Sequence, residues 1–428
     1  MVRERYGQKI KGQRACDLRR LLRQEYSLHV SYWKAWRARE IAIDDALGGA
    51  AASFALVTPY FEKMLTRNPN SVVALETETS QTGVVRFKYL FYSLDACAQG
   101  YRYMRKVIVI DATHLSGRYG GCLMAASAQD GNFQVFPIGF GIVNIENDES
   151  WEWFLRKLST IVLDEHDLVF VSDRHPSIYA SIRKVYPMSS HGACIVHLQR
   201  NVVTHFKSDH LSHLTSVVGR AYRFSDFEKA FMEIKAIDES LNKVMTMVRE
   251  YPIISILETI RTTLVSWFAL RRESANTETD VVNPKIQEML IESFHKSSGY
   301  FVMKIGNGLY EVWDEVETAF AVNLSERTCT AAIREGIQVD SLVDIHYSNE
   351  YRKLAYKGLI MPVPDMDHLA PNPDDVGGGK LAPPSVRRPP GRPRKQNSRG
   401  IQACVKKEVH KVQGTWAQPF YLQSSIAG

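Results

Sequence analysis

The sequence predicts an α/β protein built on a mixed five-stranded sheet. Two uninterrupted apolar runs, residues 106–110 and 168–172, are typical of strands buried on both faces. Each run ends in an aspartate, Asp111 after the first and Asp173 after the second. Two such strands could place both carboxylates side by side at one edge of the sheet. Like charges are held that close when a divalent cation lies between them, so the pattern favours a metal-dependent phosphoryl-transfer site.

Length and composition indicate an intracellular globular protein. With 428 residues, 45% of them hydrophobic and 10% aromatic, the chain can bury at least one large core and is expected to hold two domains plus tails. No apolar run approaches the roughly 18–20 residues that span a bilayer, and the first residues lack an apolar signal-peptide core. The six cysteines are scattered without paired spacing, which argues against a disulfide framework and fits a reducing compartment.

The positive charge is concentrated near the C-terminal end. Nine Lys and Arg residues and no Asp or Glu lie between Lys380 and Lys407. Subtracting these nine charges from the net charge of +6 leaves −3 for the remainder. A basic tail of this kind is typical of contact with a polyanion.

The N-terminal 60 residues have helical periodicity. Residues 14–26 carry apolar side chains at helical intervals among many arginines, and residues 32–46 continue the pattern. Trp33 and Trp36 share one helical face. They fit a small helical core, and direct contact with nucleic acid through the arginines between them is the alternative.

The pattern then changes to that of an α/β core. Residues 85–91 alternate like a half-buried strand. The strand ending at Asp111 is followed by apolar runs 121–130 and 133–143, joined by an Asp-Gly-Asn turn, which predicts an antiparallel meander. A helix with Ser150 as N-cap comes next, then the strand ending at Asp173. Pro176 begins a second helix, residues 193–196 form a short strand, and residues 197–206 form a third helix.

This order of three strands, helix, strand, helix, strand, helix is the ribonuclease-H-like arrangement. Residues 211–272 are predicted to be almost entirely helical, and residues 285–325 to be β-rich. From about residue 361 the chain is rich in Pro and Gly and is expected to be disordered.

Several short motifs follow one another along the chain. They are residues 34–40 (KAWRARE), 109–115 (VIDATHL), 130–132 (DGN), 149–155 (ESWEWFL), 172–175 (SDRH), 194–198 (CIVHL), 239–242 (ESLN) and 267–272 (WFALRR). In this order they resemble the motifs of the Mutator-like (MULE) transposases of plants. The resemblance extends from about residue 25 to 330 and includes the basic tail.

The resemblance implies a ribonuclease-H-like core with a DDE triad. By motif, the two aspartates are Asp111 and Asp173, and the glutamate is Glu239. It implies Mg²⁺ or Mn²⁺ held by these three carboxylates, one ion activating water or a DNA 3′-hydroxyl and the other stabilising the leaving oxygen. Without the resemblance, a strand-end aspartate is more often a loop cap than a catalytic group.

Cys194 and His197 form a Cys-x-x-His pair that recurs in this family after the second aspartate. Two ligands are too few for a closed tetrahedral zinc site. A structural or DNA-positioning role is therefore favoured over zinc.

The resemblance implies four regions. Residues 1–80 are the helical N-terminal region, and residues 81–272 are the transposase domain with a helical insertion at about 205–240. Residues 273–345 are a small β-rich region with a SWIM-type finger, and residues 346–428 are a disordered tail.

Two departures from the family pattern matter. About 65 residues separate Asp173 from Glu239, which is shorter than the family's usual helical insertion. The SWIM zinc finger is degenerate, because Cys329 is followed by Ala331 where the second cysteine belongs, and His346 is isolated. Zinc is therefore not expected there. Together with the short N-terminus, these departures suggest a truncated or decayed copy, or an imperfect gene model.

The basic tail contains an AT-hook-like segment, residues 387–395 (RRPPGRPRK). Proline and glycine keep such a chain extended and slim, so that arginines can lie along the narrow minor groove of A·T-rich DNA. An unspecific basic linker or a nuclear-import signal would use the same residues. The residues assigned to DNA binding are Arg388, Gly391, Arg392, Pro393, Arg394 and Lys395.

The sequence leaves two functions of different classes open. The first is a nuclear Mutator-like DNA transposase that binds transposon ends and A·T-rich DNA, with no membrane partner and with a homo-oligomer as a further expectation. The second is a catalytically inactive, domesticated DNA-binding protein, like the far-red-response transcription factors derived from these elements. Metal-dependent activity distinguishes the two.

Overall fold

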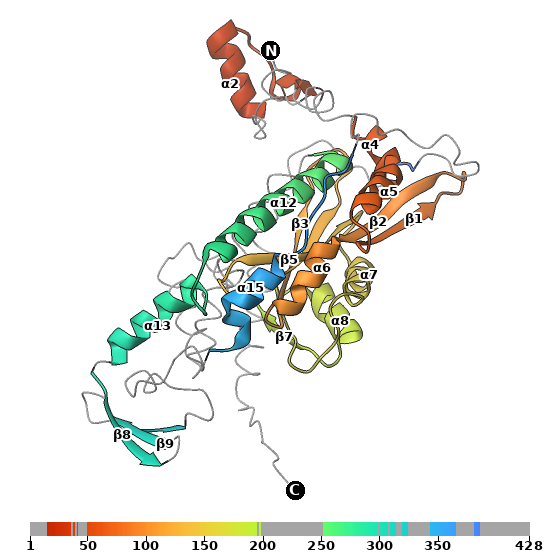
Figure 1. Cartoon of the computed structure of the whole chain (residues 1–428). Coiled ribbons are helices and arrows are strands. Elements are labelled where there is room, and N and C mark those ends of the chain that lie inside the picture. Colours follow the sequence, from red (N-terminus) through yellow and green to blue (C-terminus); the bar gives the residue numbers. More distant parts are fainter. Residues whose placement is uncertain are drawn as a thin grey trace, which may run out of the picture. The chain divides into compact units, whose positions relative to one another are not determined.

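The computed structural model describes residues 15–35, 37–38, 41, 49–194, 197, 251–297, 299–306, 309–313, 319–323, 343–364 and 381–385. Among these residues, one large mixed sheet organises the chain (Figure 1). Its strands lie in the order β1-β2-β5-β4-β3-β6-β7. Their bounds are β1 Val72–Thr79, β2 Val85–Ser93, β3 Val107–His114, β4 Cys122–Gln129, β5 Val135–Val143, β6 Val169–Ser172 and β7 Ser190–Ala193.

The predicted meander is confirmed. β3 pairs antiparallel with β4, and β4 pairs antiparallel with β5. β6 then joins the other side of β3 in parallel, and β7 is parallel to β6. The sheet has seven strands instead of the five expected, because β2 pairs with β5 and β1 pairs with β2 on the far side of the meander. β1 alternates between half-buried and exposed residues, including Glu76 and Glu78, which is a weak signal in the sequence.

One face of the sheet is covered by α7 (Asp148–Leu158) and α8 (Pro176–Val185) (Figure 1). Trp153 of α7 contacts Tyr89, and Phe154 packs edge-on against Phe91. Beyond α8, Tyr186 packs at an angle on Phe170 of β6. These aromatic contacts fix how closely the helices approach the strands.

The opposite face is covered by α5 (Val57–Arg67), α12 (Ile253–Thr277) and α15 (Asn349–Ala355). Phe61 of α5 packs against Tyr92, and Phe268 of α12 packs against Phe136 of β5. The hydrophobic core therefore lies on both sides of the sheet, and β4 and β5 are buried along their full length.

The residues that precede α7 and α8 explain where these helices begin. Pro176 lies in the first turn of α8, as predicted. The predicted N-cap Ser150 is wrong by three residues, because α7 begins at Asp148 with Asn147 as its cap. The Asn147 side chain accepts from the Ser150 N–H, and the Ser150 hydroxyl accepts from the Asn147 N–H, which forms a reciprocal capping box. The last short strand, expected at 193–196, is β7 (Ser190–Ala193), which begins three residues before that range and ends at its first residue.

Helix α12 has 25 residues and, among the described part of the chain, is long and apolar enough to cross a membrane by length and composition. The expectation that no apolar segment approaches that length is thus corrected. Buried residues recur at intervals of three and four along one side of α12 and face the core. They include Ile253, Ile256, Leu257, Ile260, Leu264 and Phe268.

Residues 343–364 are folded, whereas the sequence assigned everything from 346 onward to a disordered tail. Tyr356 is fully buried, and its hydroxyl donates to Asp130 Oδ2 at 2.7 Å. Arg272 donates to the Tyr356 carbonyl at 2.7 Å. A second segment, 381–385, is hydrogen-bonded beside β2, since the Phe87 N–H donates to the Ala382 carbonyl at 2.9 Å. Tertiary contacts order segments whose composition alone predicts disorder.

The region predicted to be β-rich, 285–325, begins with a helix. Its elements are α13 (Pro284–Ser297) and a three-stranded antiparallel sheet of β8 (Phe301–Gly306), β9 (Leu309–Trp313) and β10 (Ala319–Asn323). Cys329 and Ala331 of the SWIM-like motif lie outside the described residues. His346 is described, and its Nδ1 lies 2.6 Å from Asp344 Oδ1.

The helix predicted at residues 14–26 is α2 (Ala15–Tyr26). Trp33 is 54% exposed, and the Arg37 guanidinium lies 5.3 Å from its ring centroid. A buried role for Trp33 is therefore not observed, and Trp36 lies outside the described residues.

Candidate active site

The two predicted aspartates lie on the chain segments of the neighbouring strands β3 and β6. Asp111 lies within β3, which continues to His114 and so extends beyond the strand end predicted at Asp111, and Asp173 lies one residue beyond the end of β6. These strands pair in parallel with Val107 opposite Val169, Ile108 opposite Phe170 and Val109 opposite Val171. Two residues beyond the last of these pairs, the chain reaches Asp111 on one side and Asp173 on the other. Continuing the register brings them alongside one another, and neighbouring strands lie about 4.8 Å apart. The segments that follow the paired residues of β3 and β6 thus provide two acidic groups.

Each carboxylate is oriented by a backbone donor. Asp111 is only 9% exposed, and its Oδ1 accepts from the Ala112 N–H at 2.9 Å. Asp173 is half-buried just beyond β6, and its Oδ1 accepts from the His175 N–H at 3.1 Å. The hydrogen bond from the His175 N–H to Asp173 closes a tight turn, which leads directly into α8. Local backbone hydrogen bonds therefore orient both carboxylates, Asp111 within β3 and Asp173 just beyond β6.

Beside Asp173 lies a half-buried histidine that sequence reasoning missed. His191 of β7 has its Nε2 2.8 Å from the Ser172 hydroxyl, and its ring centroid is 4.1 Å from that of Tyr179. Burial, together with Arg183, lowers the pKa of His191 to about 4, although the nearby Asp173 opposes this shift. His191 is consequently neutral at physiological pH. In the sequence, the only feature that distinguishes His191 is that small residues flank it on both sides.

The Cys-x-x-His pair is split between the core and a partly exposed position. Cys194 is 2% exposed, and its N–H donates to the Ser172 carbonyl at 2.6 Å, which ties the end of β7 to the end of β6. His197 is half-buried and has a helical backbone conformation. The buried thiol is in keeping with the structural role favoured for Cys194.

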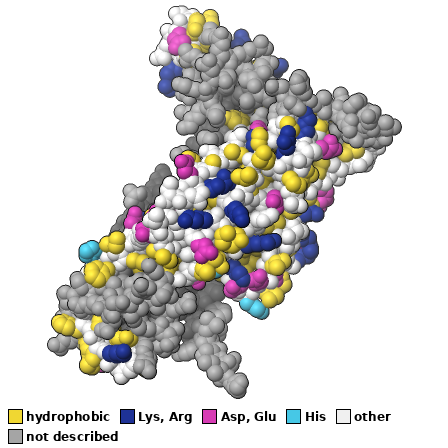
Figure 2. Space-filling view, viewed as in Figure 1, with side chains coloured by type: hydrophobic (Ala, Val, Ile, Leu, Met, Phe, Trp, Pro, Cys, Tyr) yellow, Lys and Arg dark blue, Asp and Glu magenta, His cyan; other side chains and the backbone are white. Residues whose placement is uncertain are grey.

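The remaining predicted site residues lie outside the described part of the chain. They are Glu239, assigned as the third carboxylate, and the tail residues Arg388, Gly391, Arg392, Pro393, Arg394 and Lys395. On the face shown in Figure 2, the Lys and Arg side chains of the described residues lie at several separate places with acidic and apolar side chains between them. The concentrated positive charge of the protein is that of the tail sequence.

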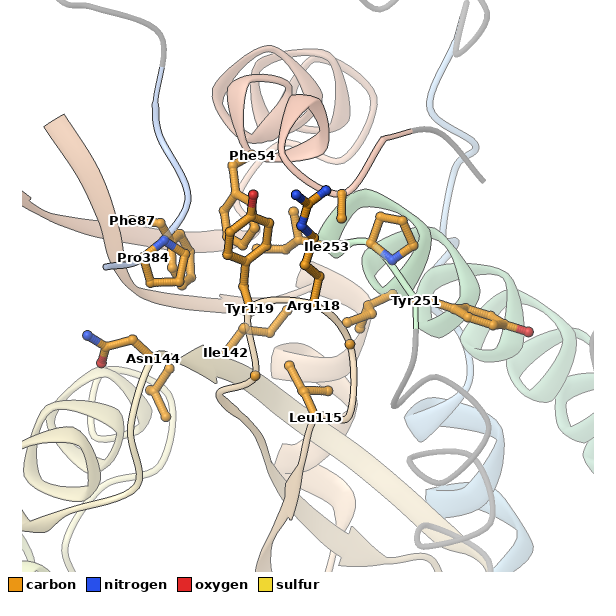
Figure 3. A pocket seen from close by; sticks show the side chains of 16 residues that line it. Phe54, Phe87, Leu115, Arg118, Tyr119, Ile142, Asn144, Tyr251, Ile253 and Pro384 are labelled. Carbon is orange, nitrogen blue, oxygen red and sulfur yellow. The ribbon is translucent and has the colours of Figure 1, made fainter. Parts of the chain in front are cut away.

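A pocket lies beyond the carboxyl end of β3. It is bounded by the β3–β4 loop, by the first turn of α12 and by α4 (Ala52–Ala55). Figure 3 shows Arg118 and Tyr119 rising from the loop toward Phe54, with Leu115 below them. The Tyr119 and Phe54 rings meet edge-on with centroids 5.5 Å apart. The pocket therefore combines aromatic walls with one exposed guanidinium at the same sheet edge as Asp111.

Residues 107–201 match the MULE transposase domain. This matched stretch contains β3 to β7 and hence both aspartates, His191 and Cys194. The family match thus covers the strands that lead to Asp111 and Asp173.

Two kinds of bacterial transposase are similar to parts of the chain. The transposase for insertion sequence element IS905 of Lactococcus lactis subsp. lactis is 26% identical over 133 residues, which are 30% of this chain and 34% of that protein. The transposase for insertion sequence element IS256 in transposon Tn4001 of Staphylococcus aureus is 30% identical over 102 residues, 24% of this chain and 25% of that protein. The matched stretches thus span about a third or less of these relatives. They support a MULE-type transposase domain in the chain.

Proposed function

We propose that this protein is a Mutator-like DNA transposase with a ribonuclease-H-like core that cleaves and joins DNA. The observation that supports this most directly is the parallel register of β3 and β6, which would set Asp111 beside Asp173 if it continued for two more residues. The strand order β5-β4-β3-β6-β7, with an antiparallel meander followed by two parallel strands, is the order expected of such a core. The match of residues 107–201 to the MULE transposase domain supports the same proposal.

The donor set suits hard divalent cations. Two carboxylates at adjacent strand ends offer the oxygen ligands that Mg²⁺ and Mn²⁺ prefer, and the burial of Asp111 strengthens its electrostatic attraction for a cation. Asp111 and Asp173, with Glu239 as the third member, would hold the metal. When bound, such ions activate the attacking oxygen and neutralise charge on the leaving oxygen of a phosphodiester.

The chain's own residues then position these groups. The Ala112 and His175 N–H donors orient the two carboxylates before metal binds, which lowers the cost of ordering them. Because His191 is neutral, it adds no positive charge that would compete with a cation near Asp173. The Arg118 side chain, exposed at the pocket beyond β3, is suited to contact a DNA phosphate.

The proposal places the protein in the nucleus, with DNA as its partner. The tail between Lys380 and Lys407 supplies nine positive charges and no negative ones. Its Arg392 and Arg394 flank Pro393 in the AT-hook-like segment, which we propose lies in the minor groove of A·T-rich DNA. Assembly into a homo-oligomer on paired transposon ends is part of the same proposal.

Metal-dependent cleavage by the purified full-length protein tests this function. We expect the native chain to nick or join DNA that carries the element's terminal inverted repeats in Mg²⁺ or Mn²⁺, but not in EDTA. Asp111→Asn and Asp173→Asn should each abolish the reaction, whereas Asp280→Asn, an exposed aspartate before α13, should retain it. Cleavage by Asp111→Asn at the native rate would refute the proposal.

A second function is favoured by the short spacing between Asp173 and Glu239, together with the basic tail. In this alternative the protein binds DNA without cutting it and acts as a domesticated transcription regulator. Binding should then weaken steeply with salt, survive Asp173→Asn, and collapse when Arg392 and Arg394 are both replaced by Ala. A salt dependence unchanged by the double replacement would count against this alternative.

A further inference from the structure

Three potential metal ligands converge at the end of the β3–β4 hairpin. His114 closes β3, Cys122 opens β4, and Glu146 lies in the loop between β5 and α7. The three ligand atoms all lie within 4.8 Å of one another. They come from three separate segments, so the sheet pairing brings them together and the sequence spacing does not reveal them.

The strand register explains why these three side chains lie close together. His114 and Cys122 are direct partners in the antiparallel pair of β3 and β4, and Cys122 is also the partner of Val143 of β5. Side chains of direct partners leave the sheet on the same face, with Cβ atoms about 5 Å apart. Three residues after Val143, the chain reaches Glu146. The pairing of three strands therefore fixes all three positions.

The distances are close to those of a metal site. Cys122 Sγ and Glu146 Oε2 are 3.7 Å apart, as are His114 Nε2 and Glu146 Oε2. Ligands of a tetrahedral zinc ion, bound at about 2.0–2.3 Å, lie roughly 3.5 Å from one another. His114 Nδ1 is closer to Cys122 Sγ, at 2.8 Å, but the imidazole is 81% exposed and can turn outward to admit an ion.

A hydrogen bond from a tryptophan side chain orients the Glu146 carboxylate. Glu146 Oε1 accepts from the indole N–H of Trp151 at 3.2 Å, which leaves Oε2 directed at the thiol and the imidazole. Trp151 is completely buried in α7, and the Glu146 side chain is only 16% exposed. A hydrogen bond that orients the ligating carboxylate in this manner is a regular feature of protein metal sites. The Cys122 thiol, 1% exposed, is also fixed by its strand.

We propose that His114, Cys122 and Glu146 form a zinc site with three protein ligands and a fourth position open to solvent. Nitrogen, sulfur and oxygen donors together suit Zn²⁺, whereas Mg²⁺ and Ca²⁺ take oxygen donors. Binding replaces the thiol proton, which leaves to solvent, with a metal–sulfur bond. The ion links the β3–β4 hairpin to the loop that starts α7.

This site is separate from the pair of aspartates. Asp111 and His114 are three residues apart on β3, whose register with β4 is continuous, so their side chains leave the sheet on opposite faces. The zinc site consequently does not depend on the proposed function. It would fix the end of the strand that carries Asp111, and it would do so equally in a protein that does not cut DNA.

Cobalt substitution of the purified full-length protein tests the site. After removal of metals, Co²⁺ is titrated in the presence of excess Mg²⁺, which occupies sites made of carboxylates alone. We expect one equivalent of Co²⁺ to give a thiolate-to-cobalt charge-transfer band in the near ultraviolet and tetrahedral d–d bands in the visible, and Zn²⁺ to displace both. Cys122→Ser should abolish the charge-transfer band.

The other variants separate binding from folding. His114→Ala should weaken Co²⁺ binding at least about tenfold without a change in folding, because its ring is 81% exposed. Glu146→Gln should weaken binding similarly. Matched controls are Cys97→Ser, a buried cysteine of α6 (Asp95–Gly100), and His166→Ala, an exposed histidine. Both controls should bind like the native protein. A charge-transfer band that persists in Cys122→Ser, or affinity that is unchanged in His114→Ala, would overturn the proposal.

Discussion

Val109 of β3 and Val171 of β6 face each other in a parallel strand pair. Each is followed two residues later by an aspartate, Asp111 or Asp173. This relationship turns two acidic residues that are distant in the chain into neighbours at one sheet edge. Neighbouring carboxylates repel each other when both are ionised, so the arrangement favours a bound cation.

Metal binding at the two aspartates should raise thermal stability. In the native protein, Mg²⁺ or Mn²⁺ at 100 times its dissociation constant stabilises the fold by about 2.7 kcal/mol. Asp111→Asn should remove that increment and should not lower the melting temperature in EDTA, because it relieves repulsion from Asp173. Thermal unfolding followed by circular dichroism, with and without Mg²⁺, measures both effects. Asp280→Asn should respond to Mg²⁺ like the native chain, and equal Mg²⁺ stabilisation of Asp111→Asn would contradict the assignment.

Stability should decrease in mild acid because of His191. Its pKa is lowered from 6.5 to about 4 in the folded protein, so the unfolded chain takes up the proton first as the pH falls. The free energy of unfolding is therefore unaffected above about pH 6.5 and decreases between about pH 6.5 and 4. The loss is of order 2 kcal/mol, after allowance for partial exposure of the ring.

Urea unfolding at a series of pH values measures this loss. His191→Gln, which cannot titrate, should show a smaller decrease over that range than the native protein. His166→Gln changes an exposed histidine and should keep the native pH dependence. Identical pH profiles for His191→Gln and the native chain would show that His191 is not the responsible group.

The hydrogen bonds between Tyr356 and the sheet should contribute measurably to the free energy of unfolding. The Tyr356 hydroxyl donates to the buried Asp130 Oδ2 and accepts from Arg271 at 3.0 Å. Tyr356→Phe leaves a buried carboxylate oxygen short of a donor and should cost about 1–3 kcal/mol. Urea unfolding measures the difference. Tyr32→Phe, at a 57% exposed tyrosine, should be neutral, and an equal effect of both changes would argue against the buried contact.

Close packing of α7 on the sheet should make Gly141 intolerant of a side chain. A Cβ at Gly141 would lie 2.7 Å from Phe154 Cδ2, inside van der Waals contact. Gly141→Ala is expected to lower the free energy of unfolding by about 1–3 kcal/mol, as overpacking does in other cores. Chemical denaturation gives this value.

Gly192 provides the matched strand control. A Cβ there meets nothing within 4 Å, so Gly192→Ala should leave stability unchanged or raise it by up to about 1 kcal/mol. If both glycine variants behaved alike, the close approach of Phe154 to the sheet would not be the factor that limits position 141.

Periodicity predicted the central strands well because they are apolar on both faces. β4 and β5 lie close to their expected limits, β3 continues to His114 and so past its expected end at Asp111, and the turn at residues 130–132 joins β4 and β5 as predicted. The start of α7 was misread by three residues because Asn147 and Ser150 are both residue types that cap helix N-termini, and only the backbone geometry shows which one precedes the first turn. β1 was missed because its alternation between half-buried and exposed residues is a weak signal.

The sequence by itself determined the chemistry available at the candidate site and the strands that carry it. Asp111 and Asp173 come directly after apolar runs whose composition requires burial. When such runs are buried as adjacent parallel strands, the residues at their carboxyl ends lie at one edge of the sheet. These are local features, which a linear pattern records.

Only the tertiary structure decided which distant groups meet. His114, Cys122 and Glu146 converge because three strands pair in one register, and His191 is desolvated by residues of α8 that pack over it. The segment around Tyr356 is ordered by contacts with Asp130 and Arg271, more than 80 residues away in the chain. Such contacts depend on the register and on side-chain packing between segments, and neither is encoded in the spacing of residues along the chain.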